Sequence, residues 1–371
     1  MRILHTEWSD GLGGQEKRVL AELVGLAGRG HDLFLVCRAG ARIRAEAEIQ
    51  GIRVFPLSLK KPFDVSSILR LRTVLKEQGI EIINTHSGVD SWIGALAAKL
   101  AHVPLLVRTR HLNIPLRRSI LNFVHYLPDL YITCGENMRN TLVEQCGFPG
   151  NRVVSIPTGV PGEFFDVARD RGAKKEVGLD PSALVITNVG ILRRVKGHET
   201  TFRAVPDVVR EFPHARFLIV GDGPRRAELE RMANELGIQE YVRFTGFIED
   251  IGRVYACTDV AVLSSWSEGL PQSVLQALAC SVPVVATRVG GVPEVVQHEK
   301  TGFLIEPGDH AGLARNIIRV FREPEKAAEM ALAGKLLVRG RHSVGHMLDT
   351  LEALYKGLLS EKRRGFRCAA L

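Results

Sequence analysis

The residues best suited to hold a phosphate lie in the second half of the chain. Arg193, Arg194 and Lys196 follow an apolar run that predicts a strand, and Glu268 precedes Gly-Leu-Pro at the start of a helical pattern. Fixed cations stabilise the charge that builds on a departing phosphate. A helix start offers free N–H groups to phosphate oxygens, while a carboxylate beside it can bind sugar hydroxyls. These residues predict a site for a sugar joined to a diphosphate.

Glycine turns follow several predicted strands, and glycine lets the backbone come close to a ligand. The turns are Gly11–Gly14, Gly221–Pro224 and Val289–Glu294. The first differs from the G-x-G-x-x-G spacing of dinucleotide-binding proteins. A tight turn without a ligand explains the first two equally well, so both interpretations stay open at this point.

Two histidines of the first half, His86 and His111, stand just after predicted strands. The carboxyl ends of parallel strands form the edge at which open α/β sheets present ligands. Between Asp90 and Asp129 there is no acid, and the cations in that stretch are Lys99, Arg108, Arg110, Arg117 and Arg118. The pattern predicts a docking surface for an anionic acceptor. Structural histidines and a solvated basic face are the alternative interpretations.

Short apolar runs alternate with segments of helical period, which is typical of parallel sheets covered by helices. In the first half we expect strands at Ile3–Thr6, Leu33–Cys37, Val54–Leu57, Ile80–Thr85, Leu105–Thr109 and Leu130–Cys134. In the second half we expect them at Leu184–Val189, Phe217–Val220, Val242–Thr245, Val260–Leu263, Val282–Ala286 and Phe303–Ile305. The chain from Ala311 to Leu359 has helical period, and a basic, frayed end follows it.

The break between the halves is expected at Val154–Asp166, where prolines and glycines interrupt the helical period. We therefore predict an α/β chain with domains at 1–165 and 166–345, followed by a C-terminal helix and basic tail at 346–371. Two α/β halves of similar size predict a cleft between them as the place for a ligand.

Composition narrows the class of protein. The 371 residues are 45% hydrophobic and 24% charged, as in globular proteins, and 49 Lys and Arg against 41 acids give a net charge of +8. This charge suits an anionic partner but is too small for a dedicated nucleic-acid binder.

The six cysteines form no C-x-x-C pair, so we expect a reducing cytoplasm and no structural zinc. No apolar run reaches the roughly 18 residues of a membrane span, so we expect a soluble cytoplasmic protein with at most peripheral contact at the inner membrane.

Taken together and in order, the motifs resemble glycosyltransferase family 4, the retaining nucleotide-sugar transferases with the GT-B fold of two facing Rossmann-like domains. The stretches that carry the resemblance are GLGGQE, VKGHE, VGDGP, SEGLPQSVLQALA and TRVGGVPEVV. The segments LHTEWSDGLGGQE and NTHSG are similar to members from bacterial lipopolysaccharide and cell-surface polysaccharide clusters. The resemblance implies sugar transfer from a UDP- or GDP-linked donor to a glycan or glycolipid such as lipopolysaccharide core.

The resemblance also implies roles for single residues. His111 would contact the transferred sugar, Arg193 or Arg194 with Lys196 would bind the diphosphate, and Glu268 would contact donor-sugar hydroxyls. Further donor contacts would come from Gly13, Gly14, Arg194, Gly221, Gly223, Gly269, Leu270 and Gln276. The acceptor side would be His86, Arg110 and Arg117. No cofactor and no metal are implied, and no Asp-x-Asp occurs near the site.

Two positions depart from the family pattern. Gln276 stands where the second acid of the E-x7-E pattern usually binds ribose hydroxyls, and Ile191 stands where many members have an arginine. Weaker donor binding is the expected consequence, since an amide loses the charge-assisted bond. The alternatives are a nucleotide-sugar epimerase on the same fold and a binding protein with weakened catalysis. An NAD(P) oxidoreductase is disfavoured, because Cys37 and Arg38 occupy the place where a ribose-binding acid is needed.

Overall fold

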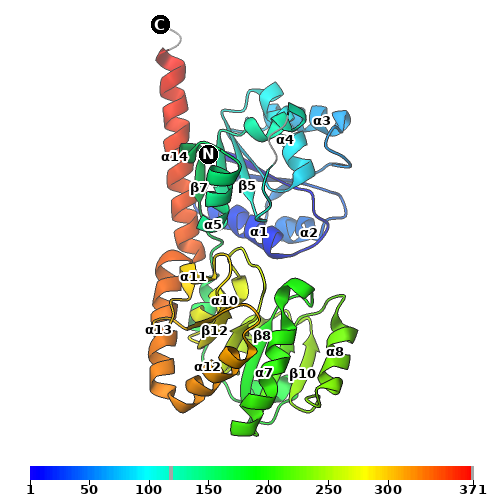
Figure 1. Ribbon diagram of the computed structural model, residues 1–371. Helices are drawn as coiled ribbons and strands as arrows, with labels where there is room; N and C mark the ends of the chain where they lie inside the picture. The colour runs from blue at the N-terminus through cyan, green and yellow to red at the C-terminus, as the bar shows by residue number, and fades with distance from the viewer. Residues whose placement is uncertain (117–119, 369–371) are drawn as a thin grey trace. The chain divides into compact units, whose positions relative to one another are not determined.

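The structure, a computed structural model, describes residues 1–116 and 120–368 of the 371 (Figure 1). It divides into two compact units: unit 1 comprises Met1–Gly159 and the chain from Val344, and unit 2 comprises Val160–Ser343. The structure divides the chain after Gly159, which is earlier than the domain boundary that the sequence predicts after residue 165. The physical reason is that Phe164 and Phe165, in the Pro/Gly-rich segment, are buried in the core of unit 2.

Unit 1 is built on a seven-stranded parallel sheet in the order β3-β2-β1-β4-β5-β6-β7. Its strands are β1 (Arg2–Glu7), β2 (Asp32–Cys37), β3 (Arg53–Pro56), β4 (Ile82–Thr85), β5 (Leu105–Arg110), β6 (Leu130–Thr133) and β7 (Val153–Ser155). Its helices include α1 (Gly14–Ala27), α2 (Arg42–Ile49), α3 (Val65–Glu77), α4 (Gly88–Ala101), η1 (Ile120–Tyr126), α5 (Glu136–Asn140) and α14 (Val344–Cys368).

Both faces of this sheet are covered, because successive residues of a strand point to opposite sides. On β1, Ile3 packs in a cluster with residues of α1 and α14, whereas Leu4 packs in a second cluster with residues of α3 and α4. Strands buried on both faces read as continuous apolar runs, which is the pattern that revealed them in the sequence. The short edge strand β7 was not predicted, because it lies at the start of the Pro/Gly-rich segment.

Helix α14 is part of unit 1. Leu348, Leu351 and Tyr355 are buried against α1, and a Cβ at Gly25 would lie 2.2 Å from the Leu348 side chain, so the close approach requires glycine there. Lys362 and Arg363 form ion pairs with Asp129 and Glu81. The expectation of a frayed basic end was wrong at Lys362 and Arg363, since both lie within α14 and are held by ion pairs.

Unit 2 has a six-stranded parallel sheet in the order β10-β9-β8-β11-β12-β13. The strands are β8 (Leu184–Val189), β9 (Ala215–Val220), β10 (Val242–Gly246), β11 (Val260–Leu263), β12 (Val284–Thr287) and β13 (Phe303–Ile305). The helices include η4 (Gly162–Asp166), α6 (Ala173–Glu176), η5 (Arg194–Lys196), α7 (His198–Glu211), α8 (Arg226–Glu235), α9 (Ile251–Ala256), α10 (Gln272–Ala279), α11 (Val292–Val295), α12 (His310–Arg322) and α13 (Pro324–Arg341).

The prediction of two parallel α/β halves with a helical C-terminal region is confirmed. Observed and expected strands agree to within a few residues at their ends, as helix and strand limits usually do. Across residues 1–116 and 120–368, none of the helices combines the length and the apolar character needed to cross a bilayer.

Candidate active site

In unit 2, the loops after β8, β9, β11 and β12 pack on one another at the carboxyl edge of the sheet. A Cβ at Gly221 would lie 2.1 Å from the Gly190 carbonyl oxygen, and one at Gly197 would lie 2.1 Å from that of Ser264. Both residues also have positive φ, +133° and +59°. Glycine is therefore required at these turns by loop packing alone. Gly223 likewise lies against the backbone of Leu192.

Lys196 and Glu268 meet at this edge. Lys196 ends η5, after β8, and Glu268 lies in the loop between β11 and α10, yet Lys196 Nζ is 2.7 Å from Glu268 Oε1. The Ser265 hydroxyl donates to the same carboxylate oxygen at 2.6 Å. The side chains keep 21% and 9% of their surface exposed, so the pair is reachable from solvent while largely screened from it. An ammonium next to a carboxylate can bind a phosphate oxygen and a sugar hydroxyl side by side.

A polar layer beneath the pair holds both loops in place. The Asn188 amide donates to the Thr201 hydroxyl at 3.2 Å, which donates to Ser264 Oγ at 3.0 Å, and Ser264 Oγ in turn donates to the Lys196 carbonyl at 3.2 Å. The backbone N–H of Trp266 donates to the Val195 carbonyl at 2.7 Å. Sequence reasoning missed Asn188 and Thr201. The available signal was polar side chains within otherwise apolar elements, as in LVITNV.

The other cations of this edge differ in how they are held. Arg193 and Arg194 are exposed on the turn that leads to Lys196. Arg225, which sequence reasoning did not single out, is 11% exposed and pairs with Glu199 and Glu228 at 2.6 Å each. Two carboxylates neutralise Arg225, so Arg193 and Arg194 are the arginines of these turns that are open to an anionic ligand.

The stretch around helix α10 contributes backbone and one amide. The Gly269 carbonyl accepts from the Gly291 N–H at 2.7 Å, which ties the loop after β11 to the loop after β12. Leu270 packs at the margin of the core, and Gln276 is half-buried on the helix. The first turn of a helix offers N–H groups that have no partner within the helix. Ile191 is 42% exposed, so the position at which many family members have an arginine faces solvent.

In unit 1, Glu7 holds the two ends of the glycine loop between β1 and α1. Its Oε1 accepts from the Ser9 N–H at 2.9 Å and its Oε2 accepts from the Gln15 amide at 2.7 Å. Burial, reinforced by the nearby charge of Asp90, raises the pKa of Glu7 to about 8. Gly13 caps α1, where its N–H donates to Glu16, and the Cβ position of Gly14 meets no atom within 4 Å. The backbone at Gly14 is therefore open to a ligand.

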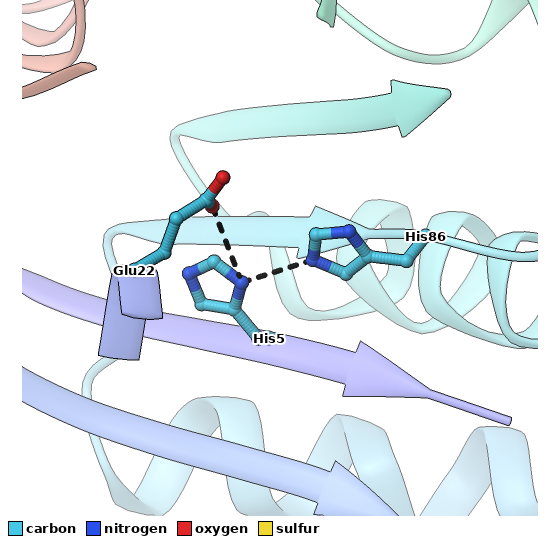
Figure 2. A group of neighbouring side chains, drawn as sticks. All are labelled: His5, Glu22 and His86. Carbon is cyan, nitrogen blue, oxygen red and sulfur yellow. Dashed lines mark hydrogen bonds and ion pairs between the residues drawn. The ribbon is translucent and has the colours of Figure 1, made fainter. Parts of the chain in front are cut away.

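The two predicted histidines lie side by side in unit 1 and are joined by a third. His86 Nδ1 lies 3.0 Å from His111 Nε2, and His86 Nε2 lies 2.9 Å from His5 Nδ1. Glu22 approaches His5 Nδ1 at 3.9 Å, as Figure 2 shows. Burial lowers the pKa of all three imidazoles, and for His86 the two flanking histidines lower it further. A lowered pKa favours the neutral form of each ring.

This arrangement bears on the predicted acceptor residues. His86 is 4% exposed and both of its ring nitrogens face other histidines, so no ring nitrogen is left for an acceptor. Arg110 donates to the carbonyls of Leu112 and Ile114, and burial together with Arg108 lowers its pKa to about 10. Arg117 lies outside the described residues.

Sequence reasoning missed the buried pair behind the histidines. Arg18 Nε donates to Glu22 Oε1 at 2.7 Å, and Arg18 Nη1 donates to the Ile156 carbonyl at 2.7 Å and to Cys134 Sγ at 3.2 Å. Both side chains are fully buried. Two charges four residues apart on an amphipathic helix usually mark an exposed face, so the local pattern concealed this pair.

Two family models match the chain. One, described as Glycosyl transferases group 1, matches residues 171–336, and the other, described as Glycosyltransferase Family 4, matches residues 12–164. The first lies within unit 2 and the second covers most of the N-terminal part of unit 1. Together they include Lys196, Glu268, His86 and His111.

Individual relatives match over most of their length. The N-acetyl-alpha-D-glucosaminyl L-malate synthase of Bacillus anthracis is 24% identical, with 92% of this chain and 93% of its own covered. The UDP-Gal:alpha-D-GlcNAc-diphosphoundecaprenol alpha-1,3-galactosyltransferase of Escherichia coli is 26% identical, with 86% and 88% covered. The Anabaena protein HepE, solved in complex with UDP, is 20% identical with a TM-score of 0.84, and 96% of this chain and 100% of that chain are covered. At that identity, the structural likeness shows the fold.

Proposed function

The chain belongs to glycosyltransferase family 4 and has the GT-B fold, and from this premise we propose that it is a retaining enzyme that transfers a sugar from a nucleoside diphosphate to a cell-surface glycan or glycolipid. The family, the fold and the transferase class predicted from the motifs are confirmed. The observation that carries the proposal is the Lys196–Glu268 pair at the carboxyl edge of unit 2, because it combines a phosphate-binding cation with a hydroxyl-binding carboxylate.

The donor would bind at this edge of unit 2. Lys196, assisted by Arg193 or Arg194, would hold the diphosphate, and Glu268 would accept hydrogen bonds from hydroxyls of the sugar. Transfer breaks the bond between sugar and phosphate, so negative charge builds on the departing diphosphate. Preorganised cations and helix N–H groups stabilise that charge more strongly than they stabilise the intact donor, which is what accelerates a reaction. The leaving phosphate would accept the acceptor's proton, consistent with retention of configuration.

The donor nucleotide is proposed as UDP or GDP. Support for UDP comes from the Escherichia coli relative, a galactosyltransferase whose donor is UDP-Gal. Gln276 would contact the ribose through its amide instead of a carboxylate. An amide oxygen still accepts a hydrogen bond but lacks the added strength of a charged acceptor, so donor affinity would be modest.

The acceptor side is assigned to unit 1. The Escherichia coli relative acts on a sugar carried by diphosphoundecaprenol, an anionic lipid-linked glycan, and we propose an acceptor of this type, such as lipopolysaccharide core. The cation Arg110, at the carboxyl end of β5, suits a negatively charged acceptor.

Peripheral contact with the cytoplasmic face of the inner membrane is proposed on the same unit. Large apolar side chains are exposed on this unit, and the exposed Lys60 and Lys61 stand shortly before the first of them in the chain. Apolar and cationic side chains together suit an anionic lipid surface. They are Phe63, Val65, Leu69, Leu112, Ile114 and Phe123.

A ligand screen tests the proposal without an acceptor. Thermal unfolding and calorimetry with UDP, GDP, ADP, their sugar conjugates, NAD and NADP report binding, because a ligand of the native state raises its stability. We expect one nucleoside diphosphate to raise the melting temperature. Lys196→Ala should abolish the shift, whereas Lys300→Ala, an exposed lysine in the turn before β13, should retain it. A shift with NAD alone, or none with any nucleotide, would contradict the proposal.

A further inference from the structure

The histidine chain of unit 1 joins three neighbouring strands. His5 lies on β1, His86 directly follows β4, and His111 directly follows β5. The sheet order β1-β4-β5 and a register that pairs His5 with Asn84 bring the three rings to one edge. The centroids of consecutive rings are 5.2 Å apart in both pairs. The family resemblance implies a role for His111, contact with the transferred sugar, and implies none for His5.

The direction of the hydrogen bonds follows from the protonation of the rings. A neutral imidazole carries one N–H and one acceptor nitrogen, so a chain of rings must donate in one direction throughout. The Glu22 carboxylate, 3.9 Å from His5 Nδ1, favours a hydrogen on that nitrogen. His5 Nδ1–H then donates to His86 Nε2 and His86 Nδ1–H donates to His111 Nε2.

The far end of the chain fits the same direction. His111 then carries its hydrogen on Nδ1, which faces Cys134 Sγ at 3.6 Å, while the Cys134 thiol donates to the Arg110 carbonyl at 3.2 Å. His5 Nε2, which has no hydrogen-bond partner, is then a bare acceptor. The opposite direction would leave a buried N–H without a partner, the rarer and costlier arrangement.

We propose that His5 and His86 are positioning residues that hold the His111 ring as a neutral imidazole with its hydrogen on Nδ1. The inference rests on the proposed function, together with the contact between His111 and the transferred sugar that the family resemblance implies. A neutral ring there, unlike an imidazolium, does not repel the positive charge that develops on the sugar in the transition state. Both ring nitrogens of His111 are engaged within the protein, so the ring is fixed in place, and its contact with the sugar would be made by ring carbon atoms and not by a nitrogen that accepts a proton.

The surroundings reinforce this state. A second proton on Nε2 of His86 or of His111 would set two N–H groups against each other across a separation of 2.9 or 3.0 Å. The titratable groups that face the chain from the packed elements are Arg18 and Glu22 of α1, Asp90 of α4, Arg110 of β5, Cys134 after β6 and Tyr355 of α14. The positive charges of Arg18 and Arg110 oppose protonation of His111.

A bound cation is the competing explanation. Within the described residues, one ligand atom each from His5, Glu22 and His86 lies within 4.8 Å of the other two, close enough to share a metal ion. Arg18 places a fixed positive charge 2.7 Å from Glu22 and neutralises the only anionic ligand of that set. The positive charge of Arg18 therefore favours the hydrogen-bonded chain of histidines over a metal site. The experiment below distinguishes these two explanations.

Nitrogen NMR of the full chain labelled with ¹⁵N-histidine tests the tautomers directly. Single His→Asn variants assign the signals, with exposed His214→Asn as the control. At neutral pH we expect His86 and His111 to show a protonated Nδ1 and a bare Nε2. A charged His111, or one protonated at Nε2, would overturn the proposal. A shift of the His5 and His86 signals with equimolar Zn²⁺ would overturn it in favour of a metal site. This readout does not depend on enzymatic activity, so it stands even if the proposed function fails.

Kinetics test whether the chain acts through His111. His5→Phe removes the hydrogen bond and should lower kcat about tenfold with the donor KM unchanged. His5→Asn retains an amide near the Nδ1 position and should keep kcat within about threefold of wild type. In a His111→Ala background, His5→Phe should have no added effect, because residues that act through one another are not additive. Equal rates in the Phe and Asn variants, or additive losses, would overturn the proposal.

Discussion

The carboxyl edges of the two sheets have the same strand arrangement but opposite kinds of chemistry. In unit 2 the edge presents charge: Lys196 and Glu268 form a partly exposed pair, and Arg193 and Arg194 reach solvent. In unit 1 the polar side chains are buried, and His5 and Glu22 have no exposed surface. An exposed cation can bind an anionic ligand and release it. A buried neutral ring has no access to solvent and stays in one position. The edge of unit 1 is therefore suited to holding a side chain in a fixed orientation.

The loops that form the two edges also differ. In unit 2, glycines let neighbouring turns touch backbone to backbone, as at Gly197 and Gly221. In unit 1, side chains from distant segments interlock, and Arg18 alone contacts Glu22, Cys134, Ile156 and Thr158. The edge of unit 2 depends on backbone geometry, and the edge of unit 1 depends on a polar network. Substitutions in the two units should therefore have different consequences.

The largest effect on stability is expected from breaking the buried pair of unit 1. Arg18→Ala leaves the Glu22 carboxylate buried without its cation, which should lower the free energy of unfolding by about 3 to 5 kcal/mol. Lys17→Ala, an exposed neighbour on α1, should change it by less than about 0.5 kcal/mol. Urea titrations of both variants measure the difference. Similar midpoints would show that the network contributes little.

Breaking the exposed pair of unit 2 should instead affect turnover. Lys196→Ala and Glu268→Ala should each reduce the transfer rate at least about 100-fold, the scale of losing one charge-stabilising group. Their unfolding free energies should change far less than that of Arg18→Ala, because the pair is partly solvated. Initial rates with the donor found in the ligand screen provide the test. Near-normal turnover in either variant would contradict the proposed site.

The dependence of stability on pH tests the buried carboxyl group of Glu7 in unit 1. The folded protein keeps this proton up to a pKa of about 8, whereas the unfolded chain releases it near 4.5. The stability contribution of the protonated carboxyl is therefore complete below pH 4.5 and is lost as the pH rises to 8. Glu7→Gln avoids this loss, so relative to wild type it should gain about 1 kcal/mol or more between pH 5 and pH 8.

The control for this series is Glu46→Gln, an exposed carboxylate on α2. Its difference from wild type should be flat with pH. Denaturant unfolding at pH 5, 6.5 and 8 gives both curves. A Glu7→Gln difference that is also flat would show that Glu7 ionises normally in the folded protein.

The smallest effect is expected at Arg110. Charge reversal by Arg110→Glu should raise the acceptor KM by about tenfold and leave the donor KM unchanged, as expected when one rim charge is lost from an encounter surface. Steady-state kinetics with each substrate varied in turn measures both. An unchanged acceptor KM would remove Arg110 from the acceptor side.

The local features of unit 2 could be predicted from the sequence with some detail. Lys196 and Glu268 each stand in a short motif, and the turns at Gly221 and Gly223 are readable because glycine at a strand end has a local backbone cause. Their meeting at 2.7 Å across 72 residues required the fold, although both follow strands of one parallel sheet.

The polar network of unit 1 could be predicted only in part. His86 and His111 were found because each follows a strand, but His5 sits within an apolar run and Arg18 and Glu22 share a helix that resembles an ordinary amphipathic one. Nothing in their neighbours along the chain signals burial. The acceptor role predicted for His86 rested on its place at the sheet edge, whereas its neighbours in space occupy both ring nitrogens.

The sequence by itself determined the parallel α/β architecture, the family and the turns that carry phosphate-binding residues, because apolar period, glycine and helix starts act over a few residues. Only the tertiary structure decided which polar groups lose water, which partner each one meets and so which histidines stay neutral. Burial and long-range pairing depend on packing between segments as far apart as Arg18 and Ile156. Their energies therefore cannot be read from either segment alone.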